Sequence, residues 1–270
     1  MKRLFISLAI LAGISLSSCN DSFLEKTPVT DLTENNAFNS YDNFKAFMWP
    51  CYEMFTNNTI RTSLQGFGQD GQYKGDMAAG YFQQKYESGY NEFAYQTVAS
   101  VASGNGWDFK SFIRRVNIML SHIDNSSMTE AQKDHWRAVG YFFHSFWYME
   151  LIDRFGDVPW VDQVLQEDSP EAYGPRVDRK TVADKVLERL QWAEQNIGNF
   201  TSQDGDNTIN QDCVRAVISR FGLREGTWRK YHELGDAEKY LQECVRASEL
   251  LMAAYPCLLY TSPSPRDVEE

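Results

Sequence analysis

The sequence predicts an all-α fold in which helices stack in antiparallel pairs. Apolar residues recur at three-four spacing in successive segments from Trp107 to Tyr255, which is the period of amphipathic helices. Helix after helix along one chain is typical of a helical-repeat stack. No 34-residue period is evident, so any tetratricopeptide-like repeats are degenerate. The length of 270 residues is ample for a buried core.

The N-terminus has the features of a bacterial export signal. Lys2 and Arg3 precede an apolar run from Leu4 to Leu16, which suits a signal peptide and is too short to span a bilayer. Small residues before Cys19, with a leucine three positions back, resemble the lipobox read by lipoprotein signal peptidase. On this resemblance residues 1–18 are a signal peptide, and Cys19 is diacylated with palmitate-type chains that give stable anchoring. An ordinary secretory signal with an incidental cysteine is the alternative.

Residues 19–39 are polar and predict an extended, lipidated tether that leads to the folded body. Pro28 supports this interpretation because it disfavours a helical conformation at the residue before it. A helix is then predicted from about Ser40 to Phe55, with apolar residues at three-four spacing. Pro50 lies inside this helix and is expected to kink it.

The sequence from Trp107 to Tyr255 predicts five further helices. The most apolar of them opens at Thr129 with a capping box that Gln132 completes. Because this helix is apolar nearly all round, it is expected to be the buried central helix. The run Phe155–Pro159 ends it with glycine followed by proline. The predicted helices are Trp107–Ile123, Thr129–Arg154, Lys180–Ile197, Gln211–Trp228 and Asp236–Tyr255.

Residues 56–106 predict a long irregular region that is rich in aromatic side chains. Repeated glycines mark turns, and no helical period is sustained. An irregular region of this length is uncommon in a compact domain unless it is functional. Neither a helix nor a strand period explains its aromatic residues, which are Phe67, Tyr73, Tyr81, Phe82, Tyr86, Tyr90, Phe93 and Tyr95.

Composition and motifs exclude several functions. The formal net charge of −11 is unfavourable for binding nucleic acid, so no nucleic-acid partner is expected. The four histidines show no metal-ligand spacing, and the glycine pairs lack the strand–turn–helix context of a nucleotide loop. No nucleophile motif and no distinguished carboxylate pair point to catalysis. The sequence therefore predicts no enzyme, no catalytic residue, no metal and no cofactor. Cys51, Cys213 and Cys244 are expected to be small buried hydrophobic residues.

The C-terminal stretch differs from everything before it. Cys257–Asp267 is rich in proline and serine and follows directly on a helical pattern. Residue by residue, it matches the translation of a common transposase-type sequencing adapter. Residues 257–270 are therefore interpreted as non-native, and the helical domain of residues 40–256 is expected to be truncated. A natural proline-rich tail is the alternative.

Two stretches together resemble a known family. Cys19–Glu25, with Pro28, is similar to the mature start of SusD/RagB-family outer-membrane lipoproteins of Bacteroidetes. Arg154–Pro159 resembles the most recognisable internal motif of that family. The resemblance runs in order from Cys19 to Tyr255 and covers Leu32-Thr33, Ala37-Phe38, Trp107 to Asn117, Arg137-Ala138, Tyr141-Phe142, Arg176 and Ala216 to Arg220.

The resemblance implies tetratricopeptide-like helix pairs in a protein anchored by lipid to the cell outer membrane, facing outside. It implies nutrient uptake, in which the protein captures an oligosaccharide or polysaccharide and delivers it to a SusC-like TonB-dependent transporter. Family members are roughly twice this length, so the chain corresponds to an N-terminal half.

Carbohydrate binding without catalysis requires flat aromatic faces together with amides and carboxylates. Aromatic rings carry a large apolar area, and tyrosine adds a polar atom. The resemblance implies that part of a glycan site lies in the irregular region, where members of the family often carry part of theirs. The candidate glycan-binding residues are Tyr73, Tyr81, Phe82, Tyr86, Tyr90 and Asn91. The alternative is that these rings pack the loop onto the helices and that the protein is a helical-repeat interaction scaffold.

Overall fold

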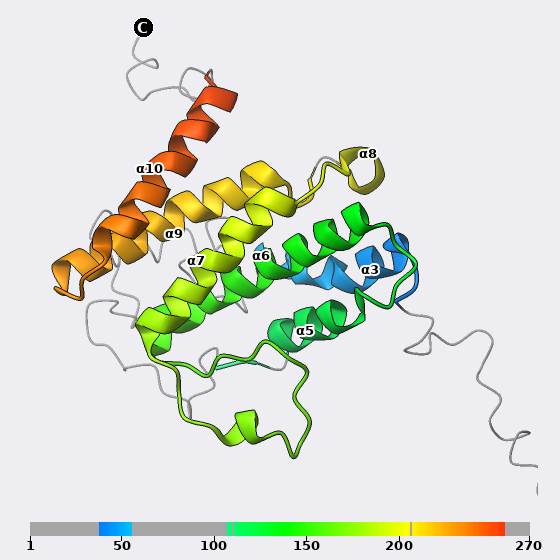
Figure 1. Cartoon of the computed structure of the whole chain (residues 1–270), viewed down its shortest axis with the longest axis horizontal. Helices are drawn as coiled ribbons and strands as arrows, with labels where there is room; N and C mark the ends of the chain where they lie inside the picture. The colour runs from blue at the N-terminus through cyan, green and yellow to red at the C-terminus, as the bar shows by residue number, and fades with distance from the viewer. Residues whose placement is uncertain (1–37, 56–106, 110, 206, 257–270) are drawn as a thin grey trace, which may run out of the picture. The chain divides into compact units, whose positions relative to one another are not determined.

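The computed structural model describes residues 38–55, 107–109, 111–205 and 207–256 (Figure 1). The predicted signal peptide, the tether as far as residue 37, the irregular region 56–106 and the C-terminal stretch 257–270 lie outside the described residues. The chain divides after Phe38, and the helices described below all belong to the unit 39–270.

The described part of this unit is helical and contains no strand. One isolated bridge pairs Val158 with Val177. The α-helices are α3 (Tyr41–Met48), α5 (Phe112–His122), α6 (Glu130–Phe155), α7 (Arg179–Asn196), α8 (Thr201–Asp204), α9 (Gln211–Tyr231) and α10 (Ala237–Ala254), and the 3₁₀ helices are η2 (Trp49–Phe55) and η4 (Pro170–Tyr173) (Figure 1). The predicted all-α fold is therefore confirmed. Within these residues, no helix combines the length and apolar character needed to cross a bilayer.

The long helices form successive antiparallel pairs. Helix α6 packs against α5 and α7, α9 lies beside α7, and α10 packs along α9 (Figure 1). The contacts establish the antiparallel direction, because Tyr141 of α6 meets Trp192 of α7 while Asp153 meets Arg179. This arrangement agrees with the predicted tetratricopeptide-like helix pairs.

Helix α6 occupies the core, as its all-round apolar sequence predicts. Its side chains from Phe142 to Ile152 are all buried. The predicted capping box closes its first turn. The backbone N–H of Gln132 donates to Thr129 Oγ1 at 3.4 Å, and the backbone N–H of Thr129 donates to Gln132 Oε1 at 3.0 Å. Each bond satisfies a backbone donor that has no partner inside the helix.

Two predicted helices differ from the structure. The helix expected from Trp107 begins at Phe112, because Asp108 accepts the Ser111 N–H at 3.1 Å and holds a turn before the helix. The helix expected over residues 40–55 changes from α to 3₁₀ at Trp49. Pro50 explains the change, since proline donates no backbone hydrogen bond and its ring crowds the carbonyl four residues earlier.

Burial also differs from the sequence pattern in places. On α10 the buried residues are Tyr240 and Ala247, whereas Leu241 and Ser248, which follow each of them in sequence, are only half-buried. Of the three cysteines in the described part, Cys51 is buried, and burial raises the pKa of its thiol to about 12. Cys213 and Cys244 are half-buried, so the expectation of buried cysteines is only partly met.

Two glycines explain how closely α9 and α10 approach. A Cβ atom at Gly222 would lie 2.6 Å from the Tyr240 carbonyl oxygen and 2.9 Å from the Cys244 nitrogen. At Gly226 it would lie 2.7 Å from Leu241 Cγ. Both neighbours of Gly222 are backbone atoms, which cannot move without moving the helix. The absence of a side chain at Gly222 therefore determines the distance between the two helices.

Replacing Gly222 by alanine is expected to lower the free energy of unfolding. Alanine gains about 1 kcal/mol in helix propensity, but inserting a methyl group into a close-packed contact costs about 1–3 kcal/mol. Urea denaturation should show a lower midpoint for Gly222→Ala. Gly174→Ala is the control, because its Cβ atom would meet its nearest neighbour at an ordinary 3.6 Å. Equal midpoints for the two variants would contradict close packing at Gly222.

Candidate functional site

The predicted lipidation and glycan-binding residues lie outside the described part of the chain. These residues are Cys19, Tyr73, Tyr81, Phe82, Tyr86, Tyr90 and Asn91. The structure does describe Phe55 and Trp107, which flank the segment 56–106 that carries the candidate glycan-binding residues. Both flanking residues pack on α6.

Phe55 lies among the aromatic rings in the middle of α6. Its ring centroid is 5.0 Å from that of Phe146, in an edge-on arrangement, and 6.0 Å from that of Phe143. Tyr52, one turn earlier, meets Phe143 edge-on at 5.2 Å, and its hydroxyl oxygen accepts the Ile209 N–H at 3.0 Å. Edge-on aromatic pairs are favourable beyond the area that they bury, so Phe55 is firmly held.

Trp107 is held at the C-terminal end of the same helix. Its ring meets Phe155 edge-on with centroids 4.9 Å apart, and the Arg176 guanidinium lies 4.8 Å from the indole centroid. Phe146 and Phe155 are about 14 Å apart along α6 at 1.5 Å per residue. The two residues that flank the segment, Phe55 and Trp107, are therefore both held on α6.

The motif after α6 has a structural role, as the sequence predicts. Gly156 adopts a positive φ of 67°, which glycine tolerates without strain. Asp157 accepts the Arg179 N–H at 2.8 Å and so caps the start of α7. Val158 exchanges backbone hydrogen bonds of 3.1 and 3.0 Å with Val177. The motif thus ends one helix and positions the next.

His144 is a core histidine of α6. Its side chain is fully buried, and Nε2 lies 2.9 Å from the Val161 carbonyl oxygen. Burial, with a smaller contribution from the Arg189 charge, holds the pKa of His144 well below its usual value. Arg137 of the same helix pairs with Asp124 and Asp134 near the surface, where its side chain is 25% exposed.

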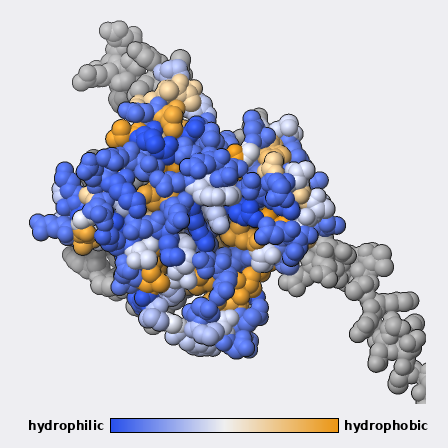
Figure 2. All heavy atoms as spheres, viewed as in Figure 1, coloured by the Kyte–Doolittle hydropathy of each residue, from blue (hydrophilic) through white to orange (hydrophobic). Residues whose placement is uncertain are grey.

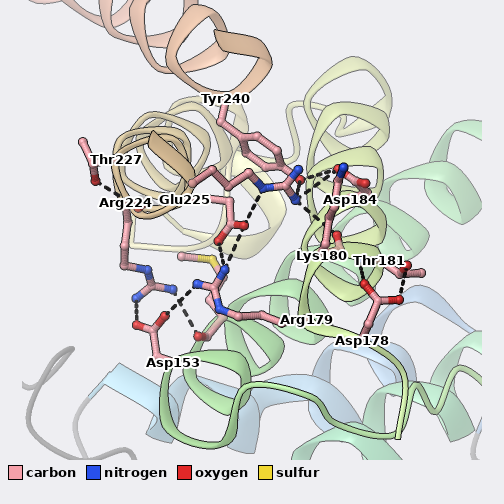
Figure 3. A network of polar contacts seen from close by, with 12 residues as sticks. Asp153, Asp178, Arg179, Lys180, Thr181, Asp184, Arg224, Glu225, Thr227 and Tyr240 are labelled. Atoms are coloured by element: carbon pink, nitrogen blue, oxygen red, sulfur yellow. Dashed lines mark hydrogen bonds and ion pairs between the residues drawn. The ribbon is translucent and has the colours of Figure 1, made fainter. Parts of the chain in front are cut away.

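A charged network ties together α6, α7, α9 and α10 (Figure 3). The Glu225 carboxylate receives Arg229 Nε at 2.7 Å and Arg179 Nη1 at 2.7 Å. Arg224 pairs with Asp153 at 2.5 Å, which joins α9 to α6. Arg229 Nη2 also donates to the Tyr240 hydroxyl oxygen at 2.9 Å, which brings α10 into the network. These pairs hold helices together.

A groove of about 430 Å³ lies between α7, α9 and α10, and most of the residues that line it are polar or charged. The C-terminal part of α7 and the N-terminal part of α9 form two of its walls, and α10 forms the third. We call it the α7–α10 groove. Its lining residues are Gln191, Glu194, Gln195, Gln211, Arg215, Glu243, Arg246 and Leu250.

Glu194 is the centre of the hydrogen bonds in the α7–α10 groove. Its carboxylate accepts Arg215 Nε at 2.9 Å and Arg246 Nη2 at 2.6 Å. Arg246 also pairs with Glu243 at 2.9 Å, and Arg215 pairs with Asp212 at 3.1 Å. Burial alone would raise the pKa of Glu194, but the hydrogen bonds from the two arginines outweigh it, and the pKa is lowered. The hydrogen bonds that Arg246 donates to Glu194 and Glu243 raise its own pKa.

No local sequence pattern indicates the α7–α10 groove. Its residues come from three helices, and all of them except Leu250 are ordinary polar or charged residues in their own helical patterns. Among the described residues, no group of three or more histidine, cysteine, aspartate or glutamate side chains is placed to hold a metal ion.

A family model for SusD-like proteins, described as "Starch-binding associating with outer membrane", matches residues 22–223. Among curated protein sequences, none matches the chain.

Solved structures with a similar fold include three proteins from Bacteroides. A SusD-like protein from B. fragilis has a TM-score of 0.55 and 19% identity, over 82% of this chain and 41% of its own. A SusD-like carbohydrate binding protein from B. vulgatus has a TM-score of 0.53 and 17% identity, over 80% and 45%. A SusD homolog from B. thetaiotaomicron has a TM-score of 0.55 and 15% identity, over 86% and 43%. The chain thus spans less than half of the length of these structures.

Proposed function

Because the chain belongs to the SusD-like family, we propose that it is a non-enzymatic, carbohydrate-binding lipoprotein of the outer membrane. It captures an oligosaccharide or polysaccharide at the cell surface and delivers it to a SusC-like TonB-dependent transporter. The observation that carries this proposal is the family match over residues 22–223, a family described as starch-binding and associated with the outer membrane. The lipobox-like sequence before Cys19 supports attachment through acyl chains.

We propose that aromatic stacking binds the glycan without chemistry. The rings of Tyr81, Tyr86 and Tyr90 provide apolar faces for sugar rings, with Tyr73 and Phe82 beside them in sequence, and the Asn91 amide provides hydrogen bonds to hydroxyl groups. The anchoring of Phe55 and Trp107 on α6 supports this assignment, because a binding segment needs a rigid support. Selectivity for a particular sugar would depend on the shape of that segment.

Replacing Tyr81, Tyr86 and Tyr90 together by alanine is expected to abolish glycan binding and leave the melting temperature unchanged. Affinity electrophoresis in gels that contain starch, laminarin or xylan would identify a polysaccharide that retains the wild-type protein, and the variant should no longer be retained. The control is the pair Tyr173→Ala and Tyr231→Ala, because these tyrosines are 79% and 78% exposed on described helices. If the triple variant is retained as strongly as the wild type, the three tyrosines do not bind the glycan.

The alternative function is a helical-repeat interaction scaffold on the outer membrane that binds protein and no glycan. The observation in its favour is a group of exposed hydrophobic side chains on α10, where Val245 is 55% and Met252 57% exposed (Figure 2). Exposed apolar groups mark interaction surfaces when they are contiguous. Binding of the transporter with no retention by any polysaccharide would favour this alternative.

A further inference from the structure

We propose that the α7–α10 groove is a second carbohydrate subsite, which binds one unit of a neutral, polyhydroxylated ligand. The inference rests on the proposed function and adds a second binding site, formed by the described helices α7, α9 and α10. The groove is separate in sequence from the tyrosines of the segment 56–106, so the two sites can be tested independently.

The size of the groove suits a small ligand. Its volume of about 430 Å³ lies within the range of roughly 300–1,000 Å³ that small-molecule sites occupy. Three helices contribute to it, and salt bridges between them hold its walls in place. A wall that is already ordered loses little conformational entropy when a ligand binds.

The charges of the groove favour a neutral ligand. The lining carries two arginines and two glutamates, and Asp212 adds one more carboxylate beside Arg215. Each arginine already contacts two carboxylates, so an anion would have to displace them. A cation would likewise meet carboxylates that already accept hydrogen bonds from the arginines. Neither a phosphate nor an amine therefore gains a free partner of opposite charge.

The free hydrogen-bonding groups match hydroxyl groups. Within the described part of the chain, the side-chain amides of Gln191 and Gln195 form no hydrogen bond. Gln211 donates its Nε2 to the Glu194 carbonyl oxygen at 2.9 Å, which leaves its own side-chain oxygen able to accept. An amide offers both donors and an acceptor, and a sugar hydroxyl both donates and accepts. Leu250, 39% exposed, adds an apolar surface for the carbon face of a sugar ring.

The test uses Gln191→Ala together with Gln195→Ala, which removes the free amides and leaves the Arg–Glu pairs intact. Isothermal titration of the full chain would use maltoheptaose, xylohexaose and mannohexaose as neutral probes, with glucuronic acid as an anionic comparison. Gln242→Ala is the control, because Gln242 is an exposed glutamine of α10 that bonds only to Glu238. Loss of two neutral hydrogen bonds should weaken binding at this subsite about tenfold.

The expected result is that the two glutamine substitutions, in a chain with Tyr81, Tyr86 and Tyr90 intact, weaken the binding of one neutral probe, whereas Gln242→Ala leaves it unchanged. Glucuronic acid should bind no more tightly than the neutral probes. If the double glutamine variant binds every probe as the wild type does, the subsite is overturned and the proposed function stands. If the wild type binds no neutral probe, the proposed function and the subsite both fail.

Discussion

Replacing Glu225 by alanine is expected to lower the free energy of unfolding by about 3–5 kcal/mol, the cost of removing one partner from a buried ion pair. Glu225 is only 1% exposed and its partner Arg229 is fully buried. Arg179, the second partner, is 14% exposed. Without the carboxylate, the guanidinium groups of Arg179 and Arg229 would lose their shared partner in a region that is largely closed to water. Their repulsion and lost hydration would separate α7 from α9.

Urea denaturation would measure this loss, and two further variants would establish its cause. Glu225→Gln keeps a hydrogen-bond acceptor and should fall between the wild type and alanine. Lys180→Ala breaks a pair with Asp236 in which both side chains are exposed, 46% and 57%, so only a small change in the urea midpoint is expected. If Glu225→Ala shifts the urea midpoint no more than Lys180→Ala does, the buried network contributes no more to stability than a surface ion pair.

Replacing Phe143 by alanine is expected to cost about 3–5 kcal/mol of stability, as large-to-small substitutions of buried aromatic residues do. Phe143 is completely buried in α6 and contacts the rings of Tyr52, Phe55 and Phe142. The cavity would lie where η2 meets α6, so the anchor of Phe55 would loosen as well.

Thermal and urea unfolding would test the Phe143 prediction. Phe143→Leu retains much of the buried volume and should be less destabilising than alanine. Tyr173→Ala removes an aromatic ring that is 79% exposed and should leave stability nearly unchanged. A loss for Phe143→Ala as small as that of Tyr173→Ala would show that the site repacks.

Helix positions could be predicted from the sequence because apolar periodicity and capping residues are local signals. The predicted helix Thr129–Arg154 matches α6 within one residue at each end, and Lys180–Ile197 matches α7 equally well. The family could be recognised from short motifs. The start of α5 was less predictable. It is set by the hydrogen bond that Asp108 accepts from the Ser111 N–H, and several backbone conformations suit the same residues.

The buried charges could not be predicted in the same way. Glu225 and Arg229 continue the three-four spacing that Phe221 and Ile218 begin, but the apolar pattern stops at Phe221, and charged residues usually indicate an exposed face. Only the tertiary structure shows that their charges neutralise each other. The α7–α10 groove has the same origin, because its residues come together only when three helices pack. The segment 56–106 lies outside the described residues, so its predicted glycan-binding residues remain predictions.

The attachment of Phe55 and Trp107 to one helix has a consequence for how binding preference can diverge among related proteins. The entropic cost of closing a chain between two fixed points rises only by about 0.6 kcal/mol for each doubling of its length. Because Phe55 and Trp107 are both held on α6, a change in the number of residues between them is expected to add little to the free energy of closing the chain. On the proposed function, sugar preference would then diverge among relatives through changes in the length and sequence of this segment.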